Sequence, residues 1–113
     1  MHYFQTIFLE EANKFIAELE TKTAKKVFYN VDLAEQTNDP KLFKKLHNDI
    51  WEFRSTYSGL QIRLLAFWDK SDGEETLVIA ALGFIKKGDK VPKNEIDRAI
   101  NIRIKYLENK VNK

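Results

Sequence analysis

Two arginines and a run of lysines are the side chains of this sequence that could act together in chemistry. Arg54 and Arg63 each lie inside a segment with the alternating pattern of a β-strand, and four lysines crowd residues 84–93. These four are Lys86, Lys87, Lys90 and Lys93. Arginine and lysine both bind phosphate groups, so a surface that gathered these cations could hold a phosphodiester.

Each of these cations also has a plain structural explanation. A charged residue on the exposed face of a sheet is commonly just solvated, and the same holds for a lysine-rich turn between a strand and a helix. The aromatic residues Phe67, Trp68 and Phe84 could stack on splayed RNA bases, although an aromatic residue on a strand is more often part of a core. The nucleic-acid interpretation therefore requires that the cations converge on one face.

Other kinds of site have little support. The sequence has no cysteine, and its two histidines, His2 and His47, are far apart, with no His-x-x-x-His motif or acidic cluster at ligand spacing. We therefore predict no metal and no cofactor. His47 is expected at the surface before a strand, as a weak candidate for proton transfer. A Gly-rich phosphate loop is absent, because all four glycines are expected at turns or strand ends: Gly59, Gly73, Gly83 and Gly88.

Length and composition set the class of protein. A chain of 113 residues has room for one hydrophobic core, so a single domain spanning residues 1–113 is expected. A hydrophobic fraction of 43% is too high for a disordered segment. The start lacks the pattern of a signal peptide and no stretch has membrane-spanning length, so we expect a soluble cytoplasmic protein with no membrane partner. The net charge of +2 is too small to argue for nucleic-acid binding by itself.

The first third of the chain reads as one strand and two helices. Residues 3–8 are rich in aromatic and β-branched residues and predict a strand. Apolar residues at helical spacing predict amphipathic helices over about residues 9–20 and 23–37, the second ending at Asn38-Asp39-Pro40. Such a helix pair must bury its apolar stripes on a sheet.

The rest of the chain predicts an antiparallel meander and a last helix. Residues 50–57 and 60–68 alternate, with Arg54 and Arg63 facing away from the aromatic side, and residues 76–85 are apolar on both faces, as in a central strand. Residues 69–73 are expected to form a hairpin loop, and Pro92 to open the last helix. The expected fold class is α+β, with a strand and helix pair packed on a sheet of three to four antiparallel strands, the first strand at an edge.

Short motifs over residues 50–99 resemble the phage-derived HigB-like branch of the RelE/ParE superfamily of type II toxin–antitoxin toxins. They are Ile50-Trp51-Glu52-Phe53-Arg54, the strand of residues 62–67, Leu82-Gly83-Phe84-Ile85-Lys86-Lys87, and Lys90-Val91-Pro92 followed by Glu95-Ile96-Asp97-Arg98-Ala99. The first half of the chain matches that branch only in its layout. Where the branch has a histidine before Gly-Phe and a tyrosine before the strand arginine, this chain has Leu82 and Ile62.

The resemblance implies a metal-independent RNA endonuclease that cleaves mRNA on the ribosome and is neutralised by a cognate helix-turn-helix antitoxin. Arg54, Arg63, Lys86 and Lys87 would form its catalytic set, with Lys90, Lys93 and Phe84 contacting RNA. The general acid and base stay unassigned. Two alternatives share the scaffold: a ParE-type toxin that binds DNA gyrase without cleaving RNA, and an inactive relative that binds only its antitoxin or DNA. The oligomeric state stays open.

Overall fold

A computed structural model describes residues 2–71, 73 and 76–111 of the chain. The first three elements are strand β1 (Gln5–Phe8), helix α1 (Glu10–Ala17) and helix α2 (Thr21–Thr37). Four further strands follow: β2 (Phe43–His47), β3 (Ile50–Tyr57), β4 (Leu60–Asp69) and β5 (Leu77–Lys86). Helix α3 (Lys93–Val111) completes the fold. No helix within these residues combines the length and the apolar character needed to cross a bilayer.

The five strands form one mixed sheet in the order β1-β5-β4-β3-β2. Strands β2 to β5 are antiparallel to their neighbours, whereas β1 pairs parallel with β5 at the edge. A parallel pair needs a crossover connection, and here α1, α2 and the β2–β4 meander lie between the two strands in the chain.

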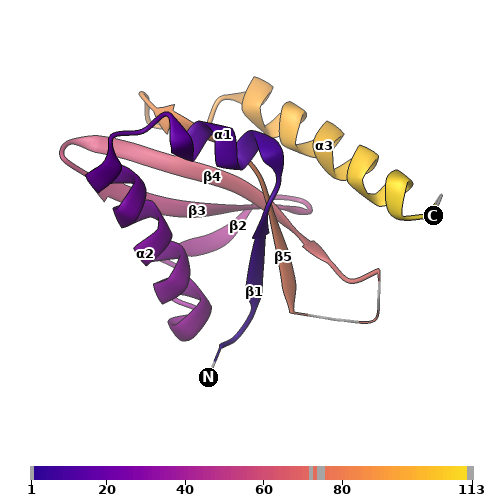
Figure 1. Cartoon of the computed structure of the whole chain (residues 1–113). Helices are drawn as coiled ribbons and strands as arrows, with labels where there is room; N and C mark the ends of the chain where they lie inside the picture. The colour runs from indigo at the N-terminus through magenta and orange to yellow at the C-terminus, as the bar shows by residue number, and fades with distance from the viewer. Residues whose placement is uncertain (1, 72, 74–75, 112–113) are drawn as a thin grey trace.

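Two hydrophobic clusters lie on the two faces of this sheet. Phe4, Val31 and Leu64 belong to the cluster that joins α1 and α2 to one face. Leu65, Phe67 and Ala99 belong to the cluster that joins α3 to the other face. Figure 1 shows α2 and α3 on opposite sides of the strands. Successive strand residues point to opposite faces, so Leu64 and Leu65 fall in different clusters.

The structure confirms the predicted α+β class, the helix pair, the meander and the edge position of the first strand. The sheet has five strands rather than three or four, because β2 was not anticipated. The C-cap of α2 is Asn38, with a left-handed φ of 53°, so the predicted stop is also confirmed. Asp72 of the predicted hairpin loop lies outside the described residues.

Gly83 was expected at a turn or strand end. The structure instead places it inside β5. A Cβ atom at this position would lie 2.2 Å from the ring of Phe15 and 2.8 Å from a methyl group of Leu64. The absent side chain therefore lets α1 approach β5 closely, which is a packing requirement rather than a conformational one.

Candidate functional site

Strand register brings three of the six predicted cations onto the α3 face of the sheet. Arg54 of β3 is paired with Arg63 of β4, and Arg63 is paired with Phe84 of β5. Lys86 is paired with Gln61, two residues from Arg63 on the same face. Directly paired residues of neighbouring strands point to the same side, so these side chains form adjacent cross-strand rows.

Glu52 lies between the two arginines and joins them. Its Oε1 is 3.4 Å from Nε of Arg54 and 3.8 Å from Nε of Arg63. Like charges directly opposite each other on a sheet are unfavourable, and the carboxylate offsets that repulsion. The buried Oε2 of Glu52 has no hydrogen-bond partner among the described residues.

Arg54 and Arg63 differ sharply in exposure, which the sequence did not predict. The side chain of Arg54 is 36% exposed, whereas that of Arg63 is 4% exposed. Arg63 donates hydrogen bonds to the carbonyl of Ile62 and to the side chain of Gln61. Burial lowers the pKa of Arg63, Glu52 opposes that shift, and Arg54 adds to it. Arg63 is therefore a fixed charge behind Arg54 rather than a surface group.

An open hollow of about 410 Å³ lies where this face meets the segment before α3. Nine residues line it: Lys44, Leu46, Glu52, Arg54, Lys86, Asp89, Lys90, Val91 and Ile96. Four of them are cations and two are carboxylates, so the hollow carries an excess of positive charge. Three of the predicted site residues, Arg54, Lys86 and Lys90, thus meet in one place.

A second hollow of about 430 Å³ adjoins the first through Arg54, which lines both. Its lining also includes Lys26 of α2, Lys41 and the buried Arg63. The two hollows therefore meet at Arg54, and both contain further cations.

The other predicted site residues lie outside the first hollow. Lys87 is exposed directly after β5 and does not line it. Lys93 is at the start of α3, where its Nζ lies 3.1 Å from a carboxylate oxygen of Asp97. Phe84 is 8% exposed and packs in the cluster beneath α3, so it offers little surface for stacking.

The matching family model covers residues 14–103 and is described as phage derived protein Gp49-like (DUF891). That range includes every residue that lines the first hollow. The chain belongs to the phage-derived Gp49-like family.

Solved structures agree with this Gp49-like assignment in their fold. A free-state double mutant of the E. coli toxin RelE superposes with a TM-score of 0.62 at 16% identity, covering 89% of this chain and 97% of that one. A chain of the intact E. coli RelBE toxin–antitoxin complex gives 0.56 at 17% identity, covering 76% and 99%. The predicted RelE-like fold is thereby confirmed. Among curated proteins, none matches this chain.

The two departures of this Gp49-like chain from the HigB-like pattern fall in its cores. Ile62 is buried in the α1–α2 cluster and Leu82 in the α3 cluster. Among the described residues, no histidine or tyrosine lines the first hollow. His47 is exposed before β3, as predicted, and is also the last residue of β2. Proton transfer in this hollow would have to use lysine and carboxylate groups.

Three hollow residues of the Gp49-like chain were missed by the sequence analysis: Lys44, Glu52 and Asp89. Lys44 was missed because β2 was missed. The signal for Glu52 was present in the sequence, since it is two residues from Arg54 in an alternating strand and therefore lies on the same face.

A larger hollow of about 610 Å³ lies near the β2–β3 turn and the end of β4. Its lining includes Trp51, Trp68 and Arg103 but none of the cations predicted for the site. Trp68, which the sequence offered as a stacking residue, therefore lies away from Arg54 and Lys86.

Proposed function

We propose that this chain is the toxin of a type II toxin–antitoxin system and that it cleaves mRNA on the ribosome. The observation that carries the proposal is the convergence of Arg54, Lys86 and Lys90 in one open hollow beside a fixed Glu52–Arg63 pair. The Gp49-like family and the RelE fold support it, and the proposed partners are the ribosome, mRNA and a helix-turn-helix antitoxin.

The chemistry requires no group that the chain lacks. In RNA, the 2′-hydroxyl attacks the adjacent phosphorus, the 5′-oxygen leaves, and a 2′,3′-cyclic phosphate forms. Arg54 would bind the scissile phosphate through its guanidinium, while Lys86 and Lys90 would stabilise the negative charge that develops on it. Arg63, which is shielded from solvent, would act as a positioning residue through Glu52.

Proton transfer is assigned to the exposed groups of the same hollow. Asp89 is an exposed carboxylate there, whereas Glu52 is engaged by two arginines. Asp89 would take the proton of the 2′-hydroxyl, and Lys86 would give a proton to the leaving oxygen. The second hollow, with Lys26 and Lys41, would hold the phosphates next to the cleaved one.

Primer extension on an mRNA translated by purified ribosomes tests the proposal. The wild-type chain should produce discrete cuts in the mRNA, and Arg54→Ala and Lys86→Ala should each slow cleavage about 100-fold, because each removes a cation at the phosphate. Lys105→Ala is the matched control, since Lys105 is an exposed lysine of α3 outside both hollows. The absence of cuts with wild type, or full cleavage by Arg54→Ala, would overturn the proposal.

One observation favours the second candidate, a ParE-type toxin that binds DNA gyrase. The first hollow has neither a histidine nor a tyrosine to transfer protons. A gyrase supercoiling assay beside the cleavage assay separates the two functions. Inhibition of supercoiling without mRNA cuts would replace the nuclease proposal with the gyrase-binding one.

A further inference from the structure

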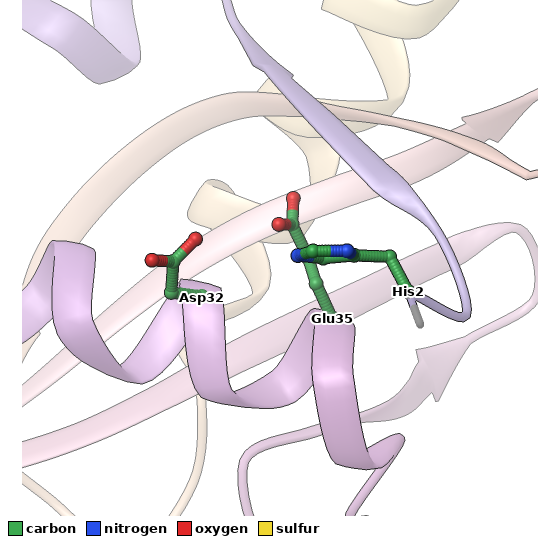
Figure 2. Close-up of side chains that lie close together, drawn as sticks. All are labelled: His2, Asp32 and Glu35. Atoms are coloured by element: carbon green, nitrogen blue, oxygen red, sulfur yellow. The ribbon is translucent and has the colours of Figure 1, made fainter.

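Three side chains with metal-ligating atoms gather away from the two basic hollows. They are His2, Asp32 and Glu35, and one ligand atom of each lies within 4.8 Å of the others. Figure 2 shows the imidazole of His2 reaching over α2, with the two carboxylates rising from that helix toward it. None of the three residues lines either basic hollow.

The backbone fixes the parts of the chain that carry these groups. The N–H of Tyr3 donates a hydrogen bond of 2.7 Å to the carbonyl of Glu35, which ties the segment before β1 to the end of α2. Phe4 follows directly and is 1% exposed in the core, so His2 is two residues from a buried anchor. The backbone next to His2 is therefore anchored to the end of α2, which keeps this residue close to Asp32 and Glu35.

Asp32 and Glu35 are three residues apart on α2, so they lie on the same side of the helix. Within the described residues, no lysine or arginine forms an ion pair with either carboxylate, and no hydrogen bond joins either one to His2. Two neighbouring like charges destabilise a helix unless a cation offsets them. The spacing leaves room for an ion between the donors.

We propose that His2, Asp32 and Glu35 bind one divalent transition-metal ion of the zinc class. An imidazole nitrogen with two carboxylate oxygens suits Zn²⁺, which binds such ligands at about 2.0–2.2 Å and accepts three protein ligands plus water. Coordination would draw the three donors closer together than in the present structure, and all three residues are exposed or half-buried, which leaves their side chains room to adjust. The bound ion would fasten the segment before β1 to α2.

This site is invisible in the sequence, because residue 2 is about thirty positions from its two partners. It goes beyond the proposed RNA chemistry and shares no residue with the basic hollows. Metal binding and mRNA cleavage can therefore be measured separately, and the failure of one leaves the other standing.

Titration of the full chain, prepared without a histidine tag, with Zn²⁺ tests the site by calorimetry. We expect one ion per chain, and His2→Ala, Asp32→Asn and Glu35→Gln should each lower the affinity at least about tenfold. His47→Ala is the matched control, because His47 is the other histidine of the chain and lies at the exposed end of β2. Circular dichroism checks that each variant stays folded.

Imidazole NMR gives a second readout that does not depend on the variants. Zn²⁺ should shift the ring resonances of His2 and leave those of His47 in place. The proposal fails if no ion binds, if the affinity is unchanged in His2→Ala, or if His47→Ala weakens binding equally.

Discussion

The side chains around Arg54 show that strand alternation predicts which face of the sheet a side chain lies on, but not how deeply that side chain is buried. Alternation correctly placed Arg54 and Arg63 on the same face, away from the aromatic side of β3. It did not predict that Arg63 is shielded, because burial depends on neighbours from other strands and from α3. Only the coordinates show Glu52 within 4 Å of both guanidinium groups. Two arginines paired across neighbouring strands repel each other, so such a pair indicates that a carboxylate lies nearby.

Replacement of Glu52 tests whether this carboxylate positions Arg54. Glu52→Gln keeps the shape and removes the charge, so Arg54 loses its ionic contact and repulsion from Arg63 is no longer offset. We expect kcat for mRNA cleavage to fall about tenfold or more with a smaller change in KM, since the misplaced group acts on the transition state. Stopped-time cleavage assays at several mRNA concentrations measure both constants.

Two comparisons make the result for Glu52 specific. Glu52→Asp, which keeps the charge, should recover part of the lost kcat, whereas a purely structural role would leave it no more active than Glu52→Gln. Arg63→Lys should lower kcat in the same direction as Glu52→Gln, because it loosens the same contact. Unchanged kcat in Glu52→Gln would show that Arg54 needs no carboxylate to hold it.

At the scale of elements, the sequence predicted those that bury many apolar residues. The helix pair, the three strands of the meander and α3 all have a clear apolar period. Strand β2 has none, since Lys44, Lys45 and His47 leave only Phe43 and Leu46 to pack inward. Lysines on an edge strand hinder pairing with other chains. In β2 these lysines also interrupt the apolar pattern, which is why the sequence did not predict this strand. The parallel pairing of β1 with β5 depends on tertiary packing, so the local sequence pattern could not predict it either.

Helix α3 is attached to the sheet by a polar anchor at Asp69, the last residue of β4. The buried carboxylate accepts hydrogen bonds from the Tyr106 hydroxyl at 2.6 Å and from the Lys110 ammonium at 2.8 Å, and two more from Ser71. Burial alone would raise the pKa of Asp69, but the hydrogen bonds from Lys110, Ser71 and Tyr106 outweigh it and hold the pKa well below its usual range.

Asp69→Asn should lower the free energy of unfolding by about 1–3 kcal/mol at neutral pH, because charged hydrogen bonds are lost. The folded-state pKa of Asp69 is depressed, so its ionised carboxylate contributes fully to the free energy of unfolding at pH values above the unfolded-state pKa of about 3.9. This contribution is lost progressively as the pH falls from about 3.9 toward the folded-state pKa. Urea unfolding should therefore show a constant gap between wild type and variant at pH 5 to 8 and a narrowing gap below about pH 4.

The exposed Asp49 gives the control for this measurement. It lies 3.6 Å from Arg103 of α3 with a side chain that is 70% exposed, so Asp49→Asn should change stability far less. Equal effects of the two substitutions, or a gap that is independent of pH down to pH 2, would show that Asp69 does not anchor α3 through its charge.

For the whole molecule, the placement of charged residues says more about a possible RNA-binding surface than the net charge does. The chain carries only +2, yet several of its cations line two hollows that share Arg54. Several acidic residues are instead paired on or near α3, where Glu11 and Glu95 both contact Arg98. Partial desolvation lowers the pKa of Arg98, but the contacts with Glu95 and Glu11 outweigh it and raise the pKa above its ordinary value. Composition alone could not distinguish the basic hollows from the ion-paired acidic residues near α3, because the residues of the two regions are interleaved along the chain.

Salt dependence measures this concentration of charge directly. If three phosphates are neutralised, one in the first hollow and one each at Lys26 and Lys41 of the second, the logarithm of the RNA association constant should fall with the logarithm of salt concentration with a slope of about −2. A 2′-O-methyl RNA oligonucleotide, which has no free 2′-hydroxyl to attack, allows binding to be followed by fluorescence anisotropy without cleavage. Lys41→Ala, which removes the cation at a neighbouring phosphate, should make the slope shallower by about 0.7, whereas Lys105→Ala, outside the hollows, should leave it unchanged. A slope near zero for the wild-type chain, or equal slopes for these two variants, would mean that the hollows do not contact the RNA backbone.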